Sequence, residues 1–133
     1  MPEFQLNVGG AYPTWATLDA FTKGYLEAAF FADCPEGDEW ENVSLADMHA
    51  DAWKEVRTDC ASFQQRFGGL LEQACRFGLN YDMAAAGRDF WYTRQGHGVG
   101  YWDRGLKGTG KALTNACGWR TDFPEVDFEG WFN

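Results

Sequence analysis

The chain has 133 residues, of which 45% are hydrophobic and 17% aromatic, enough to fill the core of one domain over residues 1–133. The formal net charge of −9 argues against direct nucleic-acid binding, because that affinity comes chiefly from lysine and arginine. No segment approaches the roughly 18 apolar residues that span a bilayer. The start, MPEFQLNVGG, lacks the basic and apolar parts of a signal peptide, so we expect a cytoplasmic protein without a membrane role.

The charge is unevenly distributed. Residues 1–59 hold twelve carboxylates against three basic residues, and residues 121–133 hold four carboxylates and no base. Residues 60–120 have the opposite balance, with eight basic residues against four carboxylates. The chain therefore has an acidic front, a mildly basic middle and an acidic end.

The first predicted helix begins at Thr14 or Thr17, either of which could be its N-cap, and ends near Asp33 because Pro35 cannot continue it. The preceding Phe4 to Pro13 is predicted to be an irregular or briefly extended lead-in. Residues 35–41, here called the acidic loop, concentrate four carboxylates around one tryptophan. Such a loop is either a solvated turn or part of a binding surface.

A long amphipathic helix is predicted next. Ser44 and Asp47 have the spacing of a capping box that would open it. An apolar seam then recurs every three or four residues from Trp53 to Phe77. A coiled-coil dimer and a core helix packed within the chain both fit this seam, and its aromatic character favours the core helix. Gly68-Gly69 predicts a kink or a close helix crossing.

Two shorter helices are predicted in the second half. One directs Met83, Ala86 and Phe90 inward, and the other, entered over residues 103–109, directs Leu106, Gly110, Leu113 and Cys117 inward. Residues 97–102 form a loop or short extended piece between them. Residues 123–132 alternate apolar and acidic side chains, which predicts a short strand or hairpin. The expected fold is therefore mainly α, with about four helices, a long one near 45–77, and a C-terminal strand or hairpin, in a single α or α+β domain.

The four cysteines do not predict a metal site. Cys34, Cys60, Cys75 and Cys117 are widely separated and have no histidine at ligand spacing. We expect four reduced thiols, no bound metal and no cofactor.

The stretch Gly87 to Gly105, GRDFWYTRQGHGVGYWDRG, is the densest in chemically active groups and is here called the motif segment. Its nineteen residues include five aromatic residues, five glycines, three arginines, two aspartates and a histidine.

This stretch resembles a family of small proteins found in bacteriophages and related mobile elements, with the recurring form G-(H/R)-D-F-W-x-T-R-N-G-H-G-x-G-F-W-D-R-G. This chain has Gln95 for the usual asparagine and Tyr101 for the usual phenylalanine. The likeness extends loosely over residues 25–128 and implies a phage or prophage setting. The residues that carry it are Gly87, Asp89, Phe90, Trp91, Thr93, Arg94, Gly96, His97, Gly98, Gly100, Trp102, Asp103, Arg104 and Gly105.

Two interpretations of the motif segment are open. In the first it is structural: its arginines and aspartates tie the loop to both helices, Trp91 and Trp102 fill the core, and His97 makes a backbone hydrogen bond. The residues in this role would be Arg88, Asp89, Trp91, Arg94, His97, Trp102, Asp103 and Arg104. In the second, His97, Asp103 and Arg94 form the centre of a small enzyme or ligand-binding module.

The phage-like motif and the acidic front together favour a binding protein over an enzyme. We hypothesise an accessory protein that inhibits a host protein, namely a nucleic-acid-binding defence system of the anti-CRISPR or anti-restriction type, by presenting carboxylates in place of DNA phosphates. A homodimeric structural protein is a further alternative. The expected partner-binding residues, here called the predicted acidic surface, are Glu36, Asp38, Glu39, Glu41, Asp47, Asp51, Glu55 and Asp59.

Overall fold

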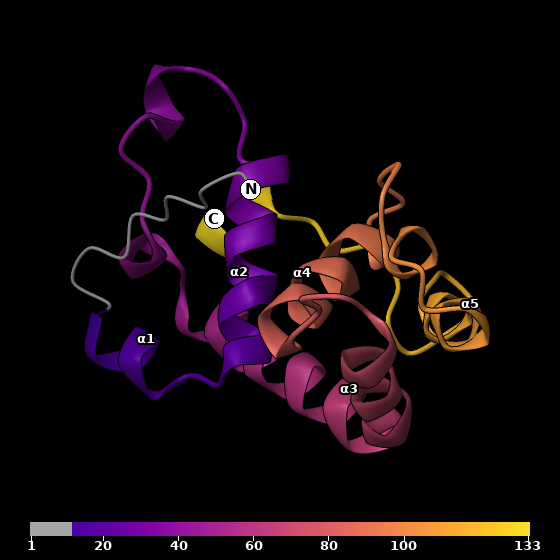
Figure 1. Ribbon diagram of the computed structural model, residues 1–133. Helices are drawn as coiled ribbons and strands as arrows, with labels where there is room; N and C mark the ends of the chain where they lie inside the picture. The colour runs from indigo at the N-terminus through magenta and orange to yellow at the C-terminus, as the bar shows by residue number, and fades with distance from the viewer. Residues whose placement is uncertain (1–11) are drawn as a thin grey trace.

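The computed structural model describes residues 12–133 (Figure 1). Within these residues the chain is mainly helical, as predicted, and contains no β-strand, so the predicted C-terminal strand or hairpin is wrong. None of the helices formed by these residues is both long and apolar enough to cross a bilayer. The predicted lead-in over Phe4 to Pro13 lies outside the described residues, except for its last two, which begin α1. The α-helices are α1 (Tyr12–Thr17), α2 (Ala20–Asp33), α3 (Ala50–Phe77), α4 (Met83–Arg94) and α5 (Gly108–Asn115).

The first predicted helix is divided into α1 and α2, because Asp19 starts a new helix. Its Oδ1 accepts a hydrogen bond from the Thr22 backbone N–H at 2.8 Å, which makes it the N-cap of α2. Thr17 instead donates its hydroxyl to the Thr14 carbonyl oxygen at 2.7 Å. The predicted end is confirmed, since α2 stops at Asp33, two residues before Pro35.

The capping box is present but opens a different element. The Ser44 hydroxyl accepts from the Ala46 N–H, and the Asp47 carboxylate accepts from the Ser44 N–H at 2.8 Å, around the short 3₁₀ helix Leu45–Asp47. The long helix α3 begins later, at Ala50. Its N-cap is His49, whose Nδ1 accepts from the Ala52 N–H at 3.1 Å.

Helix α3 is kinked where the glycine pair predicted it. Phe67 leaves the helical region, with φ −119° and ψ 22°, directly before Gly68-Gly69. A Cβ at either glycine would meet no atom within 4 Å, so the glycines do not mark a close crossing. After the kink the predicted Ala74 is still buried and Leu71 is buried too, while Phe77, which was predicted to face inward, is 55% exposed. Before the kink the seam is packed within the chain, as the core-helix interpretation expects.

Helices α2 and α4 cross in close contact (Figure 1). Gly24 and Gly87 lie at the crossing, and a Cβ on Gly87 would come within 1.9 Å of the Phe21 carbonyl oxygen. A Cβ on Gly24 would come within 2.0 Å of the Ala84 carbonyl oxygen. Only glycine allows the two backbones to approach this closely.

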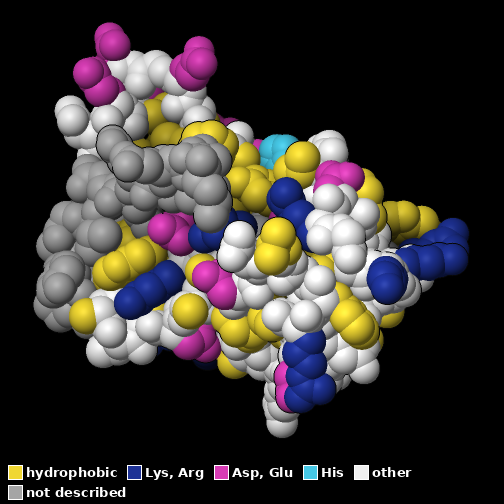
Figure 2. Space-filling model, in the orientation of Figure 1, with side chains coloured by type: hydrophobic (Ala, Val, Ile, Leu, Met, Phe, Trp, Pro, Cys, Tyr) yellow, Lys and Arg dark blue, Asp and Glu magenta, His cyan; other side chains and the backbone are white. Residues whose placement is uncertain are grey.

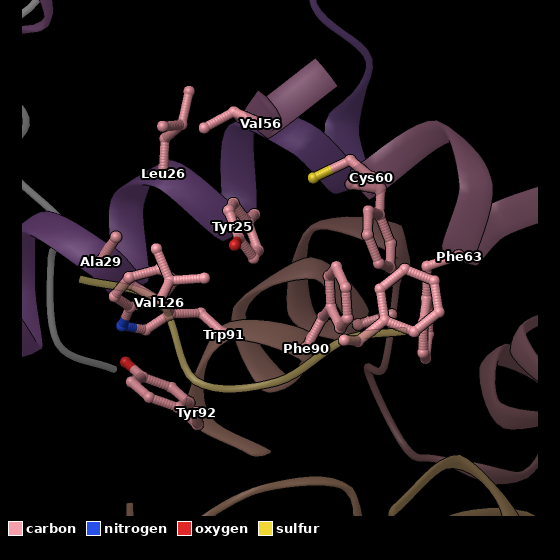
Figure 3. Close-up of a cluster of buried hydrophobic side chains, with 14 of the residues drawn as sticks. Tyr25, Leu26, Ala29, Val56, Cys60, Phe63, Phe90, Trp91, Tyr92 and Val126 are labelled. Atoms are coloured by element: carbon pink, nitrogen blue, oxygen red, sulfur yellow. The ribbon is translucent and has the colours of Figure 1, made fainter. Parts of the chain in front are cut away.

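The core is an aromatic cluster between α2, α3 and α4 (Figure 3). Phe63 of α3 and Phe90 of α4 stack with ring centroids 4.2 Å apart, and Tyr25 of α2 lies 5.2 Å from Phe90. Phe123 from the C-terminal segment meets Phe63 edge to face at 5.2 Å. Burying large rings with this geometry adds to the stabilisation that apolar burial alone provides.

The C-terminal segment is held by side chains rather than by a neighbouring strand, which explains why the alternating pattern does not form a β-ladder. The Gln95 side chain donates to the Val126 carbonyl oxygen at 2.8 Å and accepts from the Val126 N–H at 2.6 Å. Further along, the His49 backbone N–H donates to the Trp131 carbonyl oxygen at 3.0 Å. The chain ends in the 3₁₀ helix Glu129–Phe132.

Candidate functional site

Arg94, at the end of α4, is the most buried arginine of the motif segment, with only 5% of its surface exposed. It pairs with Asp59 of α3 at 3.0 Å and also donates to the Tyr25 hydroxyl and the Pro124 carbonyl oxygen. Burial disfavours the charged guanidinium, but Tyr25 and Asp59 outweigh it and hold the pKa of Arg94 above its ordinary value. Arg94 therefore joins α2, α3, α4 and the C-terminal segment.

Asp89 forms a second buried network within the motif segment. Both of its carboxylate oxygens accept hydrogen bonds from Arg104, at 2.8 to 3.2 Å, in a forked pairing. The Tyr81 hydroxyl donates to the same carboxylate at 2.7 Å. This network fastens the loop after α4 to the body of that helix.

His97 is half-buried and bonded to α2 through its side chain. Its Nε2 lies 2.8 Å from Asp33 Oδ2, and the Trp91 indole N–H donates to the same oxygen at 2.6 Å. The predicted backbone hydrogen bond is present too, from the His97 N–H to the Tyr92 carbonyl oxygen at 3.0 Å. Asp33 thus joins the end of α2 to the motif segment at two points.

The proposed centre of His97, Asp103 and Arg94 is not assembled. His97 is bonded to Asp33 and Arg94 to Asp59, whereas Asp103 is exposed on a 3₁₀ helix. Four hollows of about 440 to 580 Å³ open on the surface of residues 12–133, and His97 lines none of these four.

Arg88 and the two tryptophans of the motif segment differ in their surroundings. Arg88 lies 3.5 Å from Glu27 of α2, so each arginine of the segment has a carboxylate partner. Trp91 is fully buried, but Trp102 is 46% exposed, so the expectation that it fills the core is wrong. Trp102 lies against Gly100 on the short 3₁₀ helix Tyr101–Asp103, at the edge of the fold.

The predicted acidic surface is divided in the structure. Six of its residues are exposed and form no ion pair with any residue from 12 to 133, namely Glu36, Asp38, Glu39, Glu41, Asp51 and Glu55. Asp59 does not belong with them because it is paired with Arg94. Asp47 is exposed, but its carboxylate is used in the capping box, and it precedes α3, which carries Asp51 and Glu55.

The acidic loop projects from the body of the molecule. In Figure 2, acidic side chains stand out at the top of the view over the loop that follows α2, while lysine and arginine gather on the side where α5 lies. On the face that Figure 2 shows, the acidic loop therefore lies apart from these lysine and arginine side chains.

A hollow of about 580 Å³ opens beside this loop and is here called the acidic hollow. Asp38, Glu39 and Asp47 contribute carboxylates to it, and Trp40 and Phe132 contribute aromatic walls. The two rings meet edge to face at 5.5 Å. Carboxylates beside an aromatic face can hold lysine or arginine through ion pairs and cation–π contact.

Sequence reasoning missed the aromatic part of this hollow. Trp40 was visible among the carboxylates, and its position in the acidic loop was the available signal. Phe132 is separated from it by 92 positions, and only the fold brings the two together. Comparison of the chain with protein-family models, with curated proteins and with solved structures finds no match.

Proposed function

We propose that this protein is a phage-encoded accessory protein that binds and inhibits a host protein through its acidic loop and acidic hollow. The observation that carries the proposal is the projecting group Glu36, Asp38, Glu39 and Glu41, whose exposed carboxylates make no ion pair with any residue from 12 to 133. Elsewhere in the fold, Asp33, Asp59 and Asp89 are paired internally. Carboxylates left without internal partners are available to a partner.

The chemistry of the hollow defines the partner class. Carboxylates flanking Trp40 suit the lysine- and arginine-rich surface of a protein that itself binds nucleic acid. In this proposal the carboxylates take the place of phosphates, and the partner is a defence protein of the anti-CRISPR or anti-restriction type. The resemblance of the motif segment to phage proteins supports the setting, and the hollow supports the binding mode.

The test compares two double variants with the same change in net charge. D38N/E39Q neutralises two carboxylates of the acidic hollow, and E72Q/D103N neutralises two exposed carboxylates elsewhere. Tagged proteins are used to recover partners from host lysate, and the affinity of the recovered partner is then measured against salt. We expect D38N/E39Q to weaken binding by at least about tenfold and to flatten its salt dependence, with E72Q/D103N close to wild type.

A competition experiment tests the phosphate-mimic part of the proposal. Duplex DNA added in excess should release the partner, because both ligands would occupy the same basic surface. Recovery of no host protein, or a complex that D38N/E39Q leaves unchanged, would contradict binding through the acidic hollow. A complex that D38N/E39Q weakens but that excess duplex DNA does not release would contradict only the phosphate-mimic part of the proposal.

A further inference from the structure

A second hollow, of about 470 Å³, lies beside the motif segment and is here called the motif hollow. Arg88, Asp89, Tyr92, Val99 and Arg104, all from the motif segment, line it together with residues 79–82 and Ala85. It is separate from the acidic hollow, since the two share no residue. The motif segment therefore forms one side of a surface cavity as well as a set of internal ties.

The first observation that points to a ligand is the Tyr92 hydroxyl. Tyr92 as a whole is 9% exposed and lines the motif hollow, and its hydroxyl, which reaches solvent, has no hydrogen-bond partner among residues 12–133. Figure 3 shows Tyr92 at the edge of the aromatic cluster, on the side away from Phe63. Burial, the largest influence, raises the pKa of Tyr92, so at neutral pH the phenol is protonated and can donate a hydrogen bond.

The second observation is the state of the charged groups in the same lining. Arg104 uses Nε and Nη2 to hold Asp89, and its Nη1 has no acceptor among the described residues. Asp89 of the same lining accepts from Arg104 and Tyr81, and Asp82 caps α4 by accepting the Ala85 N–H through Oδ1 at 2.8 Å. The hydrogen-bond donors that remain for a ligand are Arg104 Nη1, which belongs to a cation, and the Tyr92 hydroxyl.

The rim of the motif hollow is apolar. Leu79 is 93% exposed and Val99 is 41% exposed, and both line the hollow. Ala85 adds a small side chain to the wall on α4. A cavity with apolar walls and a few donors at fixed positions is the usual form of a small-molecule site.

From this arrangement we propose that the motif hollow binds a small organic anion, with its carboxylate, sulfonate or phosphate group on Arg104 and the Tyr92 hydroxyl and its apolar or aromatic body against Leu79, Ala85 and Val99. The anion accepts from donors that the fold leaves unused. The body covers apolar side chains that are otherwise in water. This site does not depend on the acidic hollow or on a protein partner.

The test uses two fluorescent probes of nearly the same shape. 8-Anilinonaphthalene-1-sulfonate carries an anionic group on an aromatic body, and N-phenyl-1-naphthylamine is its neutral counterpart. We expect the sulfonate to bind one per chain and to shift the NMR amide signals of Ala85, Tyr92 and Val99. Signal changes centred instead on Trp40 and Phe132, or no saturable binding, would overturn the proposal.

Substitutions at Tyr92 and Val99 test which side chains contact the sulfonate. Tyr92→Phe keeps the ring and removes the unpartnered hydroxyl, and we expect it to weaken sulfonate binding by about threefold to tenfold. Val99→Glu and Val99→Lys place opposite charges at the rim, and we expect the lysine variant to bind the sulfonate about threefold to tenfold more tightly than the glutamate variant. The neutral probe should not distinguish these two variants. Equal sulfonate affinity in all three variants would contradict an anion site.

Two controls separate loss of the site from loss of the fold. Ala85→Trp fills the hollow and should abolish binding, while thermal unfolding shows whether the variant is folded. Trp119→Ser removes an exposed aromatic side chain outside the hollow and should leave sulfonate binding unchanged. Loss of binding on Trp119→Ser would mean that the probe binds exposed apolar surface in general, and the proposal would fail.

Discussion

Gln95 and Val126 are joined by a reciprocal pair of hydrogen bonds, with the side-chain amide acting where a neighbouring strand would act in a sheet. Removing the Gln95 amide leaves the backbone N–H and C=O groups of the buried Val126 without these partners. We expect Gln95→Ala to lower the free energy of unfolding by about 1–3 kcal/mol and to speed hydrogen exchange of the Val126 amide. Gln65→Ala, at an exposed position of α3, is the control and should change stability by less than about 0.5 kcal/mol. Unchanged exchange at Val126 would contradict the role given to Gln95.

Asp59 and Asp51 are both on α3 and were both placed on the predicted acidic surface, but their environments differ. Asp59→Asn leaves the buried Arg94 charge without its carboxylate, so we expect a loss of about 3 kcal/mol in denaturant unfolding. Asp51→Asn removes an exposed carboxylate and should change stability by less than about 0.5 kcal/mol. Equal effects of the two substitutions would show that the ion pair contributes little.

Gly87, at the α2–α4 crossing, and Gly69, in α3, should respond in opposite ways to replacement by alanine. Gly87→Ala places a Cβ against the Phe21 carbonyl oxygen and should cost at least about 3 kcal/mol, because a backbone atom has to move. Gly69→Ala meets no atom within 4 Å and should add roughly 0.5–1 kcal/mol through helix propensity. Thermal and urea unfolding of both variants measure the difference, and a tolerated Gly87→Ala would mean that the helices are farther apart.

The N-cap of α2 predicts a pH dependence. Burial by itself raises the pKa of Asp19, but hydrogen bonds from Thr22 and Gln64 outweigh it, and the pKa lies below its ordinary value of 3.8. A carboxyl whose pKa is lower in the folded state stabilises the fold above the unfolded pKa, and this stabilisation disappears as the pH falls through the folded pKa. We expect Asp19→Ala to cost about 1 kcal/mol at pH 7 and less below about pH 4.

Asp19→Asn is the matched variant for this titration. It keeps an oxygen that can accept from Thr22 but does not ionise, so its stability relative to Asp19→Ala should stay nearly constant with pH. Unfolding curves between pH 3 and pH 7 make the comparison. A constant difference between wild type and Asp19→Asn over that range would rule out the lowered pKa as a source of stability.

The cysteines should differ in reactivity. Burial raises the pKa of all four thiols, to about 12 for Cys117 and further for the fully buried Cys60, and less for Cys34 and Cys75. Since the thiolate is the reactive form, we expect iodoacetamide at pH 8 to label Cys34 and Cys75 first. Mass spectrometry of peptides over time measures the order. Early labelling of Cys60 in the folded protein would contradict its burial.

The features predicted correctly from the sequence are those set by neighbouring residues. Pro35 ends α2, Gly68-Gly69 accompanies the kink in α3, and Ser44 with Asp47 forms a capping box. The features missed depend on distant residues. That Asp59 is not a free surface charge follows only from Arg94, which is 35 positions away.

Other features were predicted wrongly because a residue has a structural role that is unusual for its type or its pattern. His49 caps α3, although serine, threonine, aspartate and asparagine are the usual N-caps. The alternation over residues 123–132 is typical of a strand, but its backbone finds Gln95 and His49 instead of a strand partner. The burial of Leu71 and the exposure of Phe77 lie beyond the kink at Phe67, whose backbone angles periodicity does not supply.

The crossing of α2 and α4 at Gly24 and Gly87 is a fixed part of the fold that protein engineering can keep constant while the acidic loop is varied. The acidic loop leaves this pair of helices at the end of α2, and the motif segment continues from the end of α4. A library that randomises residues 36–41 while keeping both glycines would vary the contact surface on a constant scaffold. Selection from such a library could redirect the acidic loop to new targets, provided that Asp33 is kept, because it anchors the base of the loop to Trp91 and His97.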